Sequence, residues 1–210
     1  MASEPATKMI ARSSIAITPP VRTVGDWEVS GCTTEASLRI ADVTAAAKYR
    51  VVALPGSAAA ELLNCRFQAS RREGSTMIVG VGADEWMVVV PAGETSSVVV
   101  GLSVLDDGGL SVLADVTHAG VLLRITGEGA VDVLTRMCAV DFSDAKFPNG
   151  ATFRSSLARV VSDVIRDDVS AEHSYLIHSD RSSGQYLFDS FLNVGAQFSI
   201  GVAGYPASGI

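Results

Sequence analysis

The segment Gly127-Glu128-Gly129 comes nearest to a ligand-binding motif in this sequence. It follows a predicted strand and begins a predicted helix, which is where the G-x-G-x-x-G fingerprint of dinucleotide-binding proteins lies. The third glycine of that pattern would fall at position 132, where the sequence has Asp132. A carboxylate beside the helix N-terminus would repel a pyrophosphate. We therefore expect a tight strand-to-helix turn here and no dinucleotide site.

The histidines are too few and too dispersed to predict a metal or acid–base site. Asp115 and His118 are three residues apart in a predicted strand, so their side chains should point to opposite faces. His173 and His178 are five apart in another strand region and should also diverge. We expect His118 to be a hydrogen-bonded structural residue, and we expect no bound metal.

Nucleophilic and phosphate-binding motifs are absent from the sequence, which contains neither Gly-x-Ser-x-Gly nor a P-loop. The acidic pairs Asp106-Asp107 and Asp167-Asp168 occur in turn-like contexts and are interpreted as solvated surface. The cysteines form no Cys-x-x-Cys pair and are expected to be small buried residues in a reducing compartment; they are Cys32, Cys65 and Cys138. The residues thus predict that the chain performs no catalysis by itself.

The elements that would position a functional site are arranged in an internal repeat. Residues 52–63 run from a β-branched strand through a glycine into an alanine- and leucine-rich helix, and residues 123–134 repeat this pattern. The aligned positions are Gly56 with Gly127, Ala59 with Ala130, and Leu63 with Leu134. An acidic-aromatic strand and a further helix follow each copy. We predict an α+β protein of two tandem βαββαβ-like (ferredoxin-like) halves packed together, with residues 48–117 superposing on 119–198.

Hydrophobic periodicity and turn residues predict the individual elements. Strands are expected at 38–41, 48–54, 76–81, 86–90, 111–117, 121–126 and 174–178, with two strands or one bent strand over 151–166. Helices are expected at 57–65, 95–105 and 130–138, and a last one capped by Ser182-Ser183. The valines at 98–100 would suit a strand equally well.

The predicted organisation is an N-terminal arm (1–36), two halves (37–118 and 119–200) and a C-terminal tail (201–210). The arm has three prolines and no hydrophobic period, yet it has too many apolar residues for a solvated tail. We expect it to be extended and to order on neighbouring subunits. Trp27 is the expected interface anchor, because a large amphipathic ring favours such contacts.

Composition excludes several classes of partner. The net charge is −7 and Arg71-Arg72 is the only adjacent basic pair, which argues against nucleic-acid binding. The longest apolar runs are far shorter than the ~20 residues that span a bilayer, so no membrane association is expected. No secretory signal is recognisable, which predicts a cytoplasmic protein. Only three of the sixteen basic residues are lysines, and this is a weak indication of assembly.

An ordered set of segments resembles the gamma subunits of heterotetrameric sarcosine oxidases. The set covers roughly residues 36–198 and comprises Asp84-Glu85-Trp86, Asp115-Val116-Thr117-His118, the segment 127–134, Cys138-Ala139-Val140-Asp141-Phe142, Phe147-Pro148-Asn149-Gly150 and Tyr186-Leu187-Phe188-Asp189-Ser190-Phe191. That family is related to the folate-binding fold of the glycine-cleavage aminomethyltransferase, which the repeat fits.

The resemblance implies a structural or assembly role in a bacterial complex with alpha, beta and delta subunits. Such a complex demethylates sarcosine oxidatively to glycine, passes the one-carbon unit to tetrahydrofolate and produces hydrogen peroxide. It also implies that FAD, FMN, NAD and tetrahydrofolate belong to the larger subunits. For this chain it implies no catalytic, cofactor-binding or metal-binding residue.

The alternative is a free-standing folate-binding or aminomethyltransferase-like protein. A folate pocket would need an acidic residue among aromatic rings between the two halves, and Asp84 beside Trp86 is the nearest candidate. A stand-alone dehydrogenase is disfavoured by the interrupted glycine pattern.

Overall fold

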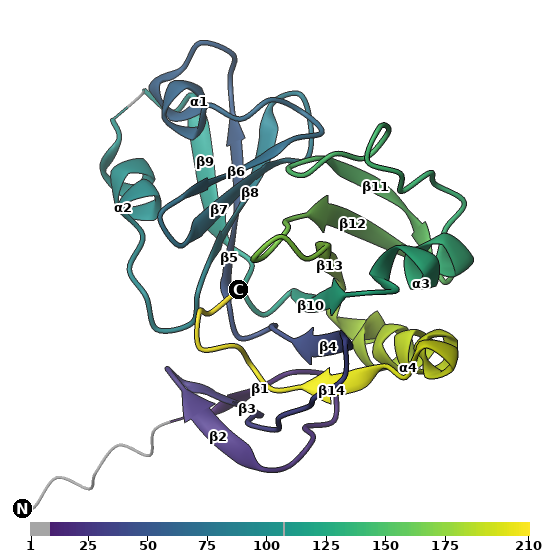
Figure 1. The fold of residues 1–210 in the computed structure, drawn as a ribbon. Helices are drawn as coiled ribbons and strands as arrows, with labels where there is room; N and C mark the ends of the chain where they lie inside the picture. Colours follow the sequence, from purple (N-terminus) through teal and green to yellow (C-terminus); the bar gives the residue numbers. More distant parts are fainter. Residues whose placement is uncertain (1–8, 107) are drawn as a thin grey trace, which may run out of the picture.

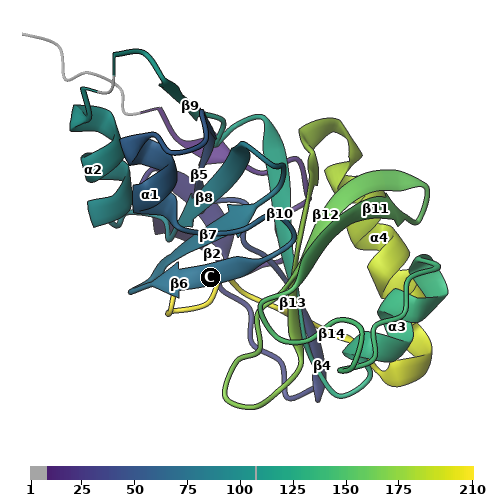
Figure 2. The ribbon, with the colours of Figure 1, turned by 90° about the horizontal axis from the view of Figure 1, so that it is seen from above.

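Two β-sheets pack face to face, and each carries a pair of helices on its outer side (Figure 1). Seen from above, the order of layers is helices, sheet, sheet, helices (Figure 2). The computed structural model describes residues 9–106 and 108–210. Among the described residues, no helix combines the length and apolar character needed to cross a membrane.

The first sheet has five strands and two helices. Its strand order is β6 (Ser70–Glu73), β7 (Thr76–Gly80), β8 (Glu85–Val90), β5 (Ala47–Ala53) and β9 (Ser111–Asp115). The helices are α1 (Ala58–Leu63) and α2 (Ser97–Val104). The Ser57 side chain caps α1 and the Ser96 side chain caps α2, each accepting from a backbone N–H in the first turn.

The second sheet repeats this order and adds one strand. It runs β11 (Thr152–Leu157), β12 (Val160–Arg166), β13 (Ser174–Asp180), β10 (Gly120–Gly127), β4 (Leu38–Asp42) and β14 (Gly201–Ala203). The helices are α3 (Ala130–Met137) and α4 (Gly184–Gly195), the latter between the 3-10 turns Arg181–Ser183 and Ala196–Phe198. The strand orders of the two sheets correspond, with β5-α1 and β10-α3 in equivalent positions.

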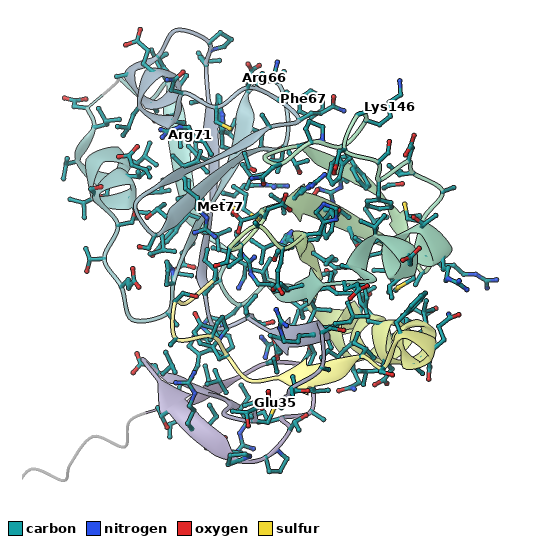
Figure 3. The ribbon with its side chains drawn as sticks, viewed as in Figure 1. Glu35, Arg66, Phe67, Arg71, Met77 and Lys146 are labelled. Atoms are coloured by element: carbon teal, nitrogen blue, oxygen red, sulfur yellow. The ribbon has the colours of Figure 1, made fainter. Side chains whose placement is uncertain are left out.

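Three apolar clusters hold the layers together. One lies between the first sheet and its helices and contains Ala59 and Leu63; another lies between the second sheet and its helices and contains Ala130 and Leu134. All four of these repeat-aligned side chains have no exposed surface. The third cluster joins the inner faces of the sheets and includes Met77 on β7 (Figure 3). Each sheet is therefore buried on both faces over much of its area.

Two strands differ from the sequence prediction. The prediction has no counterpart of β6, so each repeat has three strands between its helices where two were expected in the first. β4 was assigned to the first half, but it pairs with β10 in the second sheet. β6 has the sequence Ser-Arg-Arg-Glu, which lacks the alternating apolar residues that identify a strand. The partner of β4 is set by long-range pairing that local sequence does not show.

The N-terminal segment also differs from the expected extended arm. Strands β1 (Ala11–Arg12), β3 (Trp27–Ser30) and β2 (Val21–Val24) form a small sheet, in that order. Trp27, the expected interface anchor, is 6% exposed and stacks on His118 with ring centroids 4.9 Å apart. The expected C-terminal tail begins with β14, and the backbone of residues 204–205 then bonds to residues 30 and 32.

Lys48 lies on the inner face of β5, and its burial is expected to make the free energy of unfolding depend on pH. It has no exposed surface, and its Nζ donates to Thr44 O at 2.7 Å and Ala46 O at 2.8 Å. Burial lowers its pKa to about 7, although the charges of Asp42 and Asp115 oppose this shift. Above pH 7 the folded state loses this proton while the unfolded state keeps it up to its ordinary pKa.

The free energy of unfolding should therefore rise from pH 7 to pH 10, with a slope of up to about 1.4 kcal/mol per pH unit from this group. Urea unfolding of the wild type and of Lys48→Met across this range measures the effect. The variant should lack this rise, and parallel pH profiles for the two proteins would contradict the assignment.

Candidate functional site

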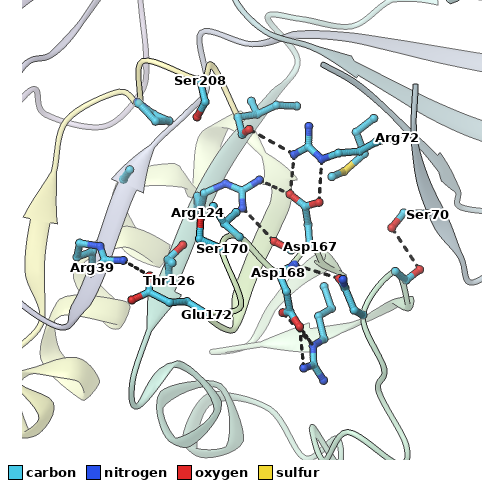
Figure 4. Close-up of a pocket in the computed structure, with 18 of the residues that line it drawn as sticks. Arg39, Ser70, Arg72, Arg124, Thr126, Asp167, Asp168, Ser170, Glu172 and Ser208 are labelled. Carbon is cyan, nitrogen blue, oxygen red and sulfur yellow. Dashed lines mark hydrogen bonds and ion pairs between the residues drawn. The ribbon is translucent and has the colours of Figure 1, made fainter. Parts of the chain in front are cut away.

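A cavity of about 870 Å³ lies where the two sheets meet at one end (Figure 4). The first sheet supplies residues of β6 and β7, and the second sheet supplies residues of β4 and β10. The loop after β12 (residues 167–172) and the segment after β14 complete the wall. The cavity has the size of a small-molecule site.

Asp167 is the centre of the cavity's polar network. Arg72 binds it in a bidentate manner, with Nε donating to Oδ1 at 2.9 Å and Nη2 donating to Oδ2 at 2.6 Å. Arg124 donates from Nη2 to the same Oδ2 at 2.5 Å (Figure 4). Arg72 comes from β6 and Arg124 from β10, so this carboxylate joins the two sheets. Such charge-assisted pairs are among the stronger hydrogen bonds in proteins.

Burial makes this network sensitive to the loss of any member. The Arg124 and Asp167 side chains are only 7% and 12% exposed. Burial alone would raise the pKa of Asp167, but the hydrogen bonds and charges of Arg72 and Arg124 hold it below its usual value. Burial lowers the pKa of Arg124, and Asp167 opposes that shift. Each charge is therefore kept in place by its partner.

Three further arginines line the cavity, and each is paired. Arg166 binds Asp168 through Nε at 3.1 Å and Nη2 at 2.9 Å, which raises the pKa of the guanidinium. Arg39 pairs with Glu172. Arg71 pairs with Glu73, its Nη1 donating to Oε2 at 3.0 Å, and its Nε donates to Leu63 O at the end of α1 at 2.9 Å.

Arginines outnumber carboxylates among the residues that line the cavity. Five arginines and three carboxylates line the cavity, and two carboxylates outside the lining, Glu73 and Asp144, also pair with Arg71 and Arg166. Among the described lining residues there is no His, Cys, Tyr or Lys. No imidazole is available, within the described lining, to activate the hydroxyls there. The cavity is thus suited to holding an anionic or polar molecule.

The structure does not bring the sequence-predicted folate candidates into this cavity. Asp84 is exposed in the turn between β7 and β8. Trp86 points to the helix side of the first sheet, where its Nε1 donates to Cys65 O at 2.6 Å. This pair therefore does not form the acidic-aromatic pocket between the halves that the alternative hypothesis would require.

Each histidine has a different partner, and His118 lies in a turn where the sequence predicted strand spacing. His118 stacks on Trp27, while Asp115 Oδ1 accepts from the Thr117 N–H at 2.8 Å. His173 lies 3.5 Å from Asp144. His178 Nδ1 is 3.1 Å from the buried Asp163, beside a cavity of about 230 Å³. Within the described part of the chain, no three His, Cys, Asp or Glu residues are placed to hold a metal ion.

The backbone conformation explains why glycine occupies position 127, without any role in phosphate binding. Gly127 ends β10 at a φ of 109°, and a Cβ built there would lie 1.8 Å from Ser37 O, just before β4. Gly129, the N-cap of α3, has a φ of 86°. The glycines thus allow a tight turn and a close approach of two strands. Cys32, Cys65 and Cys138 are free; Cys138 is buried and the other two are half-buried.

Sequence reasoning missed the cavity's charged residues. The pair Asp167-Asp168 was interpreted as solvated surface, but both side chains are mostly buried in ion pairs. Asp107 of the other acidic pair lies outside the described residues. The adjacent basic pair Arg71-Arg72 gave only a partial signal, because Arg72 alone of the two binds this acidic pair.

Comparisons with known proteins agree on the fold. The GCVT N-terminal domain family matches residues 68–210. A chain of heterotetrameric sarcosine oxidase from Corynebacterium sp. U-96, in complex with pyrrole 2-carboxylate, aligns with a TM-score of 0.68 and 19% identity. The alignment covers 80% of this chain and 89% of that chain. No curated protein sequence gives a significant match.

Aminomethyltransferase T of the glycine cleavage system from Bartonella henselae also aligns with a TM-score of 0.68, at 14% identity. The alignment covers 90% of this chain but 56% of the transferase, so the chain spans about half of that protein. At these identities the structures show a shared mixed α+β fold.

Proposed function

The chain belongs to the GCVT N-terminal domain family, and from this membership we propose that it is a non-catalytic assembly subunit of a heterotetrameric sarcosine oxidase. In this proposal its partners are the alpha, beta and delta subunits, and it works in the cytoplasm. The whole complex oxidatively demethylates sarcosine to glycine, transfers the one-carbon unit to tetrahydrofolate and produces hydrogen peroxide.

The observation that carries the proposal is the extent of the structural alignments. The fold corresponds to 89% of one chain of a sarcosine oxidase but to 56% of an aminomethyltransferase. Because the alignment extends over nearly a whole subunit but only about half of a transferase, it favours a subunit role over that of a complete transferase. Because fold does not determine function, the site must also be consistent with the role.

The cavity supports the non-catalytic part of the proposal. Four of its five arginines are held in ion pairs with Asp167, Asp168 and Glu172, so these carboxylates are not free to act as acids or bases. We accordingly place FAD, FMN, NAD and tetrahydrofolate in the larger subunits. In this chain the network serves to join the two sheets.

One observation favours the second candidate, a free-standing folate-binding or aminomethyltransferase-like protein. The cavity of about 870 Å³ is large enough for a ligand of folate's size, and its excess of arginine would attract a carboxylate tail. This candidate predicts measurable folate binding by the isolated chain.

Co-purification of the tagged full-length chain from its host separates the two candidates. We expect larger flavin-containing partners in stoichiometric amounts. The chain purified alone should show no flavin absorbance and no micromolar folate binding by calorimetry. A lone monomer that binds folate at micromolar concentration would contradict the assembly role and support the second candidate.

A further inference from the structure

The first sheet lacks a strand that the second sheet has. β9 pairs antiparallel with β5 in the first sheet, just as β4 pairs antiparallel with β10 in the second. β14 then runs parallel to β4, with Val202 opposite Ile40. In the described part of the chain, β9 is the last strand of its sheet. The repeat thus provides a template for a sixth strand whose place beside β9 is open.

Apolar side chains near this edge are exposed to solvent, as expected where no further strand covers β9. Ala41 of β4, which faces the other sheet, is 7% exposed, whereas Val112, on the corresponding face of β9, is 62% exposed. Val52 of β5, directly opposite Val112 in the ladder, is 48% exposed. Together with their neighbours they form an apolar stripe consisting of Val52, Leu54, Leu110 and Val112. Exposed apolar stripes of this kind mark interaction sites.

The backbone of β9 offers hydrogen-bonding groups along its outer side. The Leu54 N–H donates to Leu110 O and the Val116 N–H donates to Lys48 O, both at 2.9 Å. The even-numbered residues of this segment therefore bond to β5. Because the direction alternates along an antiparallel strand, Ser111 and Leu113 direct their N–H and C=O groups outward. Such an edge is a template for another strand.

Charge indicates the chemistry of the partner. Asp106 precedes β9 and Asp115 ends it, and both are exposed. Residues 106–123 contain no lysine or arginine. The edge is therefore an apolar stripe between two acidic ends, complementary to an extended apolar segment with basic ends.

We propose that the outer edge of β9 binds an extended segment of a partner subunit, which adds a sixth, parallel strand to the first sheet. Alternate apolar side chains of this segment cover the stripe, and lysine or arginine at its ends faces Asp106 and Asp115. The mode is β-strand addition, in which backbone bonds supply affinity and alternate side chains supply specificity. The proposal deepens the proposed assembly role and rests on it for the identity of the partner.

Hydrogen exchange with mass spectrometry tests the proposal in the assembled complex. The amides of residues 111–115 should exchange at least tenfold more slowly in the complex than in the isolated chain. Ser111→Pro removes one outward N–H at the first residue of an edge strand, where proline is tolerated. Val112→Lys places a charge in the stripe. Each variant should weaken assembly at least tenfold.

Val161→Lys is the matched control, since Val161 is 58% exposed on β12. It should leave assembly within twofold of the wild type. If a β9 variant fails to fold, as judged by circular dichroism, hydrogen exchange in the wild-type complex alone tests whether residues 111–115 are covered. A complex that forms without protection of residues 111–115 would overturn the β9 proposal and leave the assembly role intact.

If the chain purifies alone, the assembly role is contradicted. Binding of a peptide then tests whether the outer edge of β9 accepts another strand. The probe is a seven-residue peptide of alternating valine and threonine with lysine at both ends. Binding that slows exchange at residues 111–115 and is lost in Val112→Lys would support the surface. Absence of binding would overturn it. So would protection that appears only as the chain self-associates, because the occupant would then be a second copy.

Discussion

Replacing Gly127 by alanine is expected to destabilise the chain by at least about 3 kcal/mol. The residue has a φ of 109°, and a Cβ there would lie 1.8 Å from Ser37 O, so the backbone of one strand must move. The aligned glycine, Gly56, has a φ of 76° but no atom within 4 Å of its Cβ position. Gly56→Ala should therefore cost only the local strain, about 1 kcal/mol.

Urea unfolding of both variants measures the difference. The sequence repeat alone predicts that valine at either of the two aligned glycines costs about 1–3 kcal/mol, because each occupies a tight turn. The structure separates them, since only Gly127 is crossed by another segment of the chain. Equal losses for the two alanine variants would contradict the close contact between Gly127 and Ser37.

Replacing Asp167 by asparagine is expected to cost about 3 kcal/mol. The change leaves Arg124, which is 7% exposed, without its carboxylate partner. A buried charge that loses its partner is costly, whereas an exposed pair contributes about 0–1 kcal/mol. Glu73→Gln, which breaks the more exposed Arg71–Glu73 pair, is the matched control and should have little effect.

The Asp167 variant should also change the response to acid. The pKa of Asp167 is lowered in the folded state, so its contribution is present above its ordinary pKa and is lost as pH falls through the lowered one. The wild type should lose stability toward low pH more steeply than Asp167→Asn. Denaturant titrations from pH 7 to pH 3 check this. Equal effects of Asp167→Asn and Glu73→Gln would show that water replaces the lost carboxylate.

The sequence predicts the parts of this fold that are encoded locally. Helices α1, α2 and α3 follow from apolar spacing, and the serine cap at Ser96 confirms the helix over the alternative strand. The aligned glycines and apolar residues reveal the repeat for the same reason. Ser183 is less informative, because it precedes α4 without making a side-chain capping bond.

The cavity could not be predicted, because its members are far apart in sequence. Asp167 meets Arg124 and Arg72 across separations of 43 and 95 residues. An acidic pair in a turn is usually solvated, and nothing local shows that two arginines from different sheets bury it. The small N-terminal sheet was missed for a related reason, since proline-rich segments without a period acquire strands only by pairing.

The position of β4 between β10 and β14 has a consequence for the order of folding during synthesis. The first sheet is built entirely from residues 47–115, so all its strands leave the ribosome within one continuous stretch. β4, although made earlier, has its partners at residues 120–127 and 201–203 and stays unpaired until they emerge. Long-range pairing of this kind is slow, and the apolar strand β4 stays exposed until its partners are synthesised. The nascent chain should thus complete its second sheet after its first, when β14 pairs with β4, a strand made long before it.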